Sequence, residues 1–128
     1  MRKVRVYIAS PYSNGDKEEL VKKHFEVAYH LLKMGFNPYA PLYNHFLQIA
    51  YPDLDKNFPW LELDKEWLEQ CDMLVRFHFT NENNVEIFSP GADEEEAHAK
   101  LLGIPVFHFN NVDEMIGYMQ VMENHIDI

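Results

Sequence analysis

The sequence is poor in cysteine, in basic residues and in long apolar runs, and each shortage excludes a class of protein. Its 128 residues include one cysteine, Cys71, so an intramolecular disulfide framework is excluded. Eleven lysines and arginines stand against 21 acidic residues, and this net charge of −10 argues against nucleic acid or an anionic membrane as the partner. No apolar run reaches the roughly 18 residues of a membrane span, and the first residues show no signal-peptide pattern. We therefore expect an acidic, cytoplasmic protein.

The remaining composition is typical of a single globular domain. Hydrophobic residues make up 47% of the chain and charged residues 25%, which supplies a core without metal or disulfide support. No repeat, low-complexity stretch or linker interrupts residues 1–128, so we expect one domain over that range.

Strand-like and helix-like segments alternate along the chain. The strands are expected at residues 4–9, 36–40, 73–79 and 104–109. The helices are expected from Asp16 to Gly35, at 61–71, at 92–102 and from about residue 111. Alternation of this kind predicts an α/β fold, a three-layer α/β/α sandwich around a mainly parallel sheet of four to five strands.

Three details of the pattern predict local structure. Pro38 places the second strand at an edge of the sheet. The long connection 41–60, rich in proline and aromatic residues, has a functional role or contains a short helix around 45–50. Apolar residues at helical spacing predict the buried face of the first helix. That face consists of Val21, Phe25, Ala28 and Leu32.

In a parallel sheet, ligands bind beyond the carboxyl ends of the strands, here after Ala9, Ala40, Phe79 and Phe109. The turn 9–15 leads from a strand into a helix N-terminus, where free N–H groups and the helix dipole favour an anion. The turn matches neither a P-loop nor a GxGxxG fingerprint. Ligand binding and an ordinary helix-capping turn therefore both stay open.

The helix after residues 89–91 begins with three consecutive glutamates. At 100° per residue, Glu95 falls on the packing face, Glu96 at its margin and Glu94 on nearly the opposite side. A carboxylate on a packing face near a helix start can remain ionised and act as a nucleophile. Acidic residues in a first turn also simply stabilise a helix. For Glu95 the two interpretations are equally open.

Other polar and aromatic residues are weaker candidates. Asp64 lies one turn into the second helix, where acidic residues are common without a function. The seven histidines show no metal-ligand spacing, so we expect neither a metal site nor a metal cofactor. Among them, His45 in the aromatic connection is the candidate for ligand contact. Trp60, Tyr43 and Phe46 either pack that connection or form an apolar wall against a bound base.

Three segments in this order resemble the nucleoside 2-deoxyribosyltransferase-like superfamily over roughly residues 4–109. They are Tyr7 to Tyr12, Leu63-Asp64 followed eight residues later by Cys71-Asp72, and Ser89-Pro90-Gly91 with Glu95 and Ala99. The resemblance is closest to the small members with serine in the S-x-G-x-x-x-E motif, which are similar to 2′-deoxynucleoside 5′-phosphate N-hydrolases. It implies a flavodoxin-like fold, no cofactor, and a homodimer or higher homo-oligomer.

The resemblance also implies an activity, which is cleavage of the N-glycosidic bond of a (deoxy)nucleoside or its 5′-monophosphate, by hydrolysis or base transfer. Glu95 falls on the glutamate that attacks C1′, Asp64 on the aspartate that hydrogen-bonds the base, and Tyr7 on the tyrosine that positions the nucleophile. Ser89 replaces the aspartate of transferases that act on free nucleosides, and the monophosphate hydrolases carry serine there. Those hydrolases have an arginine where Ser13 lies. The substrate-binding residues expected are Ser10, Pro11, Tyr12, Ser13, Tyr43, His45, Ser89 and Gly91.

Two functions of other classes stay open. The same fold can hold a nucleotide without turning it over, which tight binding without base release would indicate. A flavodoxin-like FMN carrier is the second alternative. The lack of a Ser/Thr-rich phosphate loop argues against it, and a colourless purified protein would nearly exclude it.

Overall fold

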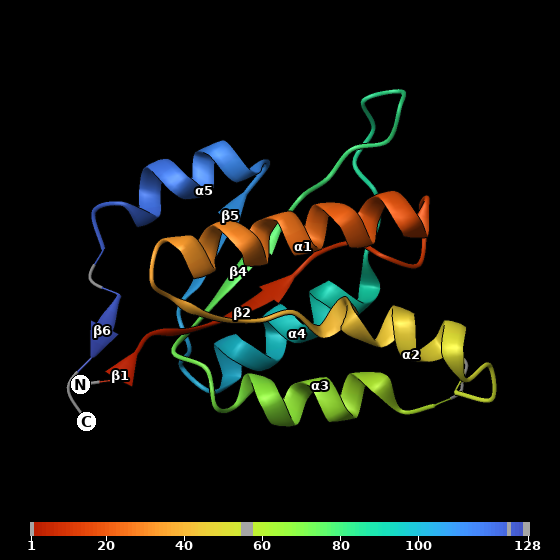
Figure 1. Ribbon diagram of the computed structural model, residues 1–128, viewed down its shortest axis with the longest axis horizontal. Helices are drawn as coiled ribbons and strands as arrows, with labels where there is room; N and C mark the ends of the chain where they lie inside the picture. The colour runs from red at the N-terminus through yellow and green to blue at the C-terminus, as the bar shows by residue number, and fades with distance from the viewer. Residues whose placement is uncertain (1, 55–57, 123, 127–128) are drawn as a thin grey trace.

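A sheet of four parallel strands forms the centre of the computed structural model, which describes residues 2–54, 58–122 and 124–126. In spatial order the strands are β3 (Asn37–Tyr39), β2 (Arg5–Ala9), β4 (Met73–Phe77) and β5 (Val106–Phe109). The α/β fold with a parallel sheet is thus confirmed, and Pro38 lies in an edge strand as predicted. A separate antiparallel pair joins the two ends of the chain (Figure 1). It consists of β1 (Arg2–Lys3) and β6 (His125–Ile126), which the sequence pattern did not predict.

Helices cover both faces of the sheet. They are α1 (Lys17–Lys33), α2 (Asn44–Ala50), α3 (Trp60–Leu68), α4 (Pro90–Leu101) and α5 (Val112–Met119), with a 3₁₀ turn η1 at Pro41–Tyr43. Figure 1 shows α1 and α5 along one side of the sheet and α3 and α4 along the other, which gives the three layers expected. Within the described ranges, no helix is long and apolar enough to cross a membrane.

Side chains alternate between the two faces of β2, and this alternation divides the core. Val6 and Ile8 belong to a cluster with residues of α1 and α5. Tyr7, between them, belongs to a second cluster with Leu68 of α3 and Ala92 of α4. Because successive residues of a strand point to opposite faces, Tyr7 lies on the same side of the sheet as α4.

The helix boundaries follow from local capping. Asp16 is the N-cap of α1, and its side chain accepts a hydrogen bond from the Glu19 N–H (3.3 Å). Gly35 follows the helix with a φ of +90°, a conformation that glycine adopts without steric cost. The short helix expected around 45–50 is confirmed as α2. Helix α3 was predicted to reach residue 71, but it ends at Leu68, because the Cys71 N–H already bonds back to the Leu68 carbonyl in a tight turn (2.9 Å).

The predicted buried face of α1 is confirmed at Val21 and wrong at Leu32. Leu32 is 59% exposed, and the helix packs on the core through a face displaced around its axis. The buried residues are Leu20, Val21, His24, Val27 and Leu31. Apolar residues of α1 form two overlapping faces, the predicted one and the one observed. The spacing of apolar residues in the sequence does not show which of these faces packs on the sheet. The displacement matters because it buries His24.

The C-terminal end of α1 supports a stability prediction with an internal control. Gly35→Ala should lower the free energy of unfolding by about 1–3 kcal/mol, because φ is positive and a Cβ would lie 2.2 Å from Asn124 Nδ2. Gly117→Ala, in α5 where a Cβ meets nothing within 4 Å, should instead stabilise by about 0.5–1 kcal/mol. Urea unfolding of both variants provides the measurement. Equal changes in the free energy of unfolding for the two variants would contradict the positive φ of Gly35 and its close contact with Asn124.

Candidate active site

A cavity of about 350 Å³ opens beyond the carboxyl ends of β2, β3 and β4. Its walls come from the β2–α1 turn, from η1 and α2, from α3, and from the first half of α4. The chain passes from β2 to β3 on one side and then to β4 on the other, so β2 marks the reversal of strand order. Open α/β sheets bind ligands at such a point. Of the four segments expected near the ligand, those after Ala9 and Ala40 line this cavity, the connection after Phe79 reaches it only at Ser89, and the segment after Phe109 does not line it.

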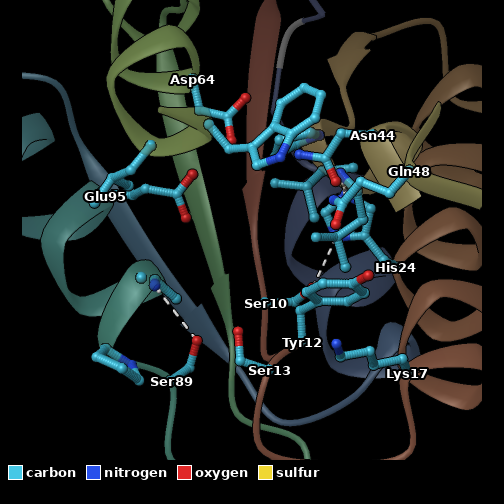
Figure 2. Close-up of a pocket in the computed structure, with 18 of the residues that line it drawn as sticks. Ser10, Tyr12, Ser13, Lys17, His24, Asn44, Gln48, Asp64, Ser89 and Glu95 are labelled. Carbon is cyan, nitrogen blue, oxygen red and sulfur yellow. Dashed lines mark hydrogen bonds between the residues drawn. The ribbon is translucent and has the colours of Figure 1, made fainter. Parts of the chain in front are cut away.

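Glu95 is the central polar group of this cavity. Its side chain extends from α4 into the cavity, and the residue is only 7% exposed (Figure 2). The hydroxyl of Tyr7, itself fully buried on β2, donates a hydrogen bond to Glu95 Oε2. The helical phase thus distinguished the three glutamates correctly. Glu94 is exposed and lies 3.5 Å from the Lys65 ammonium, outside the cavity.

Asp64 is a second buried carboxyl, and it reaches the same cavity from α3 (Figure 2). Burial raises the pKa of Asp64 to about 7, and the nearby Tyr39 hydroxyl opposes this shift only in part. Among the described residues, no hydrogen-bond partner of normal geometry lies next to Asp64 Oδ1. The Tyr39 hydroxyl near Asp64 also lacks a partner of normal geometry, so these two groups can satisfy each other.

The two carboxyls also influence each other. The pKa of Glu95 is raised to about 8, mainly by burial and also by the charge of Asp64, although the Tyr7 hydrogen bond lowers it in part. Two carboxyls that disfavour each other's ionisation share a proton near neutral pH. As the pH rises, Asp64, with the lower pKa of about 7, loses its proton before Glu95.

Arg76 of β4 fixes the position of α4 against the sheet. It is 5% exposed, and its Nη1 atom lies 2.8 Å from Asp93 Oδ1 and 3.3 Å from Glu96 Oε1. Both acceptors are neighbours of Glu95 on α4, on the side turned away from the cavity lining. Glu96, which the helical phase placed at the margin of the packing face, thus forms an ion pair with Arg76. These two bonds hold the helix turn that carries Glu95.

Hydroxyl and N–H donors line another part of the cavity. Ser89 is the N-cap of α4, and its Oγ accepts a hydrogen bond from the Ala92 N–H (3.4 Å) while its own proton stays available. Ser13, in the β2–α1 turn, and Lys17, the first residue of α1, also line the cavity, and Figure 2 shows both away from Asp64 and Glu95. Two helix N-termini and a cation favour a negative group there.

Several cavity residues were not expected from the sequence. They are Lys17, His24, Asn44 and Gln48. His24 lies on the same buried face of α1 as Leu20 and Leu31, so a correct prediction of that face would have included it. Asn44 and Gln48 lie one turn apart on α2, a helix that the sequence predicted without indicating which face it turns to the cavity. Of the three aromatic residues considered for an apolar wall, Trp60 lines the cavity, whereas Tyr43 and Phe46 lie outside the lining and Phe46 stacks on Phe25.

Of the eight expected substrate-binding residues, five line the cavity. These are Ser10, Tyr12, Ser13, Ser89 and Gly91. A Cβ at Gly91 would meet nothing within 4 Å, so glycine there leaves cavity space and is not needed for packing. His45 lies outside the lining, where its Nδ1 is 2.8 Å from the Tyr12 hydroxyl, and Tyr43 packs edge-on against Tyr39. Pro11 is buried outside the lining as well. Substrate contact by these three residues stays a prediction.

The described part of the chain contains no group of three or more His, Cys, Asp or Glu side chains that could hold a metal ion. Cys71 lies in the turn after α3, outside the cavity lining, and burial raises the pKa of its thiol to about 12. A thiol with a raised pKa is a poor nucleophile. The polar groups that line the cavity include the carboxyls of Glu62, Asp64 and Glu95, the imidazole of His24, the ammonium of Lys17, two amides and several hydroxyls.

Comparison with known proteins finds a similar fold and a family to which the chain belongs. A 2-deoxyribosyltransferase from the psychrotolerant bacterium Bacillus psychrosaccharolyticus has a similar structure, with a TM-score of 0.60 and 19% sequence identity over 94% of this chain and 93% of that one. At this identity the likeness concerns the fold. No curated protein sequence matches the chain significantly. A family model described as a domain of unknown function, DUF7768, matches residues 4–109, and the chain therefore belongs to that family.

Proposed function

We propose that this protein cleaves the N-glycosidic bond of a nucleoside or of its 5′-monophosphate, with Glu95 as the nucleophile. The observation that carries the proposal is the buried Glu95 carboxyl, which accepts a hydrogen bond from Tyr7 and shares a cavity with a second buried carboxyl, Asp64. The fold shared with a 2-deoxyribosyltransferase supports the same class of reaction.

In the first step, a carboxylate oxygen of Glu95 bonds to C1′ of the sugar while the bond from C1′ to the base nitrogen breaks. The transition state resembles an oxocarbenium ion, which the negative charge of Glu95 stabilises. The electrons of the broken bond go to the base, and Asp64 supplies the proton that makes it a neutral leaving group. In the free protein Glu95, with a pKa of about 8, holds its proton more tightly than Asp64, with a pKa of about 7, so this step requires the proton to pass from Glu95 to Asp64 when the ligand binds.

In the second step, water attacks C1′ of the glycosyl ester and gives its proton to Asp64. The sugar leaves and the Glu95 carboxylate is restored, as microscopic reversibility requires. If a second base enters before water, the same step forms a new N-glycosidic bond and the reaction is a transfer. Trp60 lines the cavity and provides an apolar surface on which a base can stack.

A 5′-phosphate fits the donor-lined part of the cavity. Ser89, Ser13 and Lys17 line that part, and the N-terminus of α4 adds the partial positive charge of the helix dipole. Lys17 is the cation of this group, in place of the arginine that the similar hydrolases carry near Ser13. We therefore propose that the monophosphate binds more tightly than the free nucleoside.

Incubation with the common nucleosides, 2′-deoxynucleosides and their 5′-monophosphates tests the reaction, with free base measured by chromatography. Release of base with a preference for monophosphates is the expected result. Tight binding without release of any base would instead favour a nucleotide-binding module on this fold. The same preparation in light scattering tests the homodimer or higher oligomer that the family resemblance implies.

Substitution of the glutamates separates catalysis from helix stabilisation. Glu95→Gln should lower base release by about 1000-fold or more, because the amide cannot form the glycosyl ester. Glu94→Gln is the matched control on the same helix, and it should leave turnover within about twofold of wild type, because that side chain is exposed. Binding of the monophosphate should survive in both variants. Substantial turnover by Glu95→Gln would exclude the covalent mechanism.

The raised pKa of Glu95 also predicts a pH-dependent stability. Between its ordinary value of 4.5 and about 8, the folded protein keeps a proton on Glu95 that the unfolded chain has lost. The folded state binds more protons in this range, so the contribution of Glu95 to stability falls as the pH rises through it. Glu95→Gln removes this loss, and at about pH 9 it should raise the free energy of unfolding by about 1–3 kcal/mol.

At about pH 5 the wild type and the Gln variant should be nearly equal in stability, because Glu95 is protonated in the folded wild type. Denaturant unfolding at the two pH values provides the comparison. An advantage of Glu95→Gln that is the same at both pH values would contradict the raised pKa.

Replacement of the α4 cap tests the phosphate. Ser89→Asp and Ser89→Asn both preserve a good N-cap, so the two variants differ mainly in charge. The aspartate should weaken monophosphate binding by about 1–3 kcal/mol relative to the asparagine, through repulsion and loss of a donor. Calorimetric titration with 2′-deoxynucleoside 5′-monophosphates and with free 2′-deoxynucleosides gives the measurement. Equal affinity of the two variants for the monophosphate would place the phosphate elsewhere.

A further inference from the structure

His24 is a buried polar residue that connects two walls of the cavity. It lies on the buried face of α1 with 0% exposure. Its Nδ1 atom is 2.7 Å from Ser10 Oγ, at the end of β2 (Figure 2). Its Nε2 atom accepts a hydrogen bond from the Leu42 N–H in η1 (3.4 Å). All three residues line the cavity, and the mechanism proposed above does not use His24.

The imidazole of His24 is neutral in this position. Complete burial removes the water that would stabilise a charge, and it lowers the pKa of the ring to about 3. A neutral imidazole carries one N–H, so one ring nitrogen donates a hydrogen bond and the other accepts. The neighbours of the two nitrogens determine which is which.

The Leu42 backbone settles the direction of both bonds. A peptide N–H can only donate, so Nε2 of His24 is the acceptor and carries no proton. The single ring proton then lies on Nδ1 and is donated to Ser10 Oγ. The hydroxyl of Ser10 accepts that bond, and its own proton is not used in it.

We infer that His24 is a positioning residue that makes Ser10 a hydrogen-bond donor to the bound ligand. The opposite tautomer would use the Ser10 proton on His24 and leave only oxygen lone pairs facing the cavity. With the Nδ1–H tautomer, Ser10 selects a ligand oxygen that can only accept, such as a phosphate oxygen. The inference rests on the proposed function for the identity of the ligand, but the tautomer itself does not.

The first test is the ring tautomer of His24, which requires no ligand. Long-range ¹H–¹⁵N NMR spectra of the labelled wild-type protein distinguish protonated from unprotonated ring nitrogens. We expect a protonated Nδ1 and an unprotonated Nε2 for His24 at neutral pH. The His24→Asn spectrum assigns the signals by their loss, and triple-resonance experiments on the wild type serve if that variant does not fold. A protonated Nε2 would overturn the inference.

The second test is ligand affinity, with the four common 2′-deoxynucleoside 5′-monophosphates as probes in calorimetry. Ser10→Ala should weaken binding of the preferred monophosphate about tenfold to hundredfold, as expected for loss of one hydrogen bond to a charged group. His24→Leu should weaken it similarly. His24→Asn should retain most of the affinity, because its amide can replace the Nδ1–H donor.

The double variant Ser10→Ala with His24→Leu should bind no more weakly than Ser10→Ala, since both changes remove the same donor. Wild-type affinity of His24→Leu beside a weakened Ser10→Ala would overturn the inference, because His24 would not act through Ser10. Failure of the proposed reaction gives a different pattern, in which base release is absent but the tautomer and the affinity differences persist. If none of the four monophosphates binds, the role of Ser10 as a donor to such a ligand is overturned, and the NMR result then decides only the tautomer of His24.

Discussion

The hydrogen bond between Tyr7 and Glu95 is the contact on which the site depends. It joins the central strand β2 to helix α4, and both partners are buried. Because Tyr7 is flanked by Val6 and Ile8, whose side chains pack on the other face of the sheet, its own position is fixed by the core. A carboxyl that is bonded to such a rigid group has little freedom. That restriction is what a nucleophile with a fixed line of attack requires.

A buried carboxyl is unfavourable for the fold, and the surrounding groups offset this only in part. Arg76 holds the same helix turn through Asp93 and Glu96, and it lies near enough to lower the pKa of Glu95 somewhat. Burial and the charge of Asp64 act in the opposite direction and prevail. The protein thus keeps two destabilising acids in one cavity, a pattern typical of functional sites. Hydrogen-bond donors, among them Ser13, Lys17 and Ser89, line other walls of the cavity, where they favour a ligand group that accepts hydrogen bonds.

Much of this was predictable because it depends on short-range patterns. The four parallel strands, the short helix α2 and the stop at Gly35 follow from local composition and capping. The burial of Glu95 follows from helical phase, because adjacent residues of a helix differ by 100°. The same reasoning failed for Leu32, because α1 carries two apolar faces that overlap and its phase is decided by the sheet it covers.

The sequence by itself thus determined the order of the four sheet strands and of the helices between them, a cavity at the carboxyl ends of strands, and the carboxyl on the inner side of α4. Tertiary structure decided the partners of those groups. The contact of Tyr7 with Glu95 joins residues 88 positions apart, and the contacts of His24 with Ser10 and Leu42 join a helix, a strand end and a 3₁₀ turn. Such contacts depend on how the layers pack, since spacing along the chain indicates which way a side chain points but not what it meets.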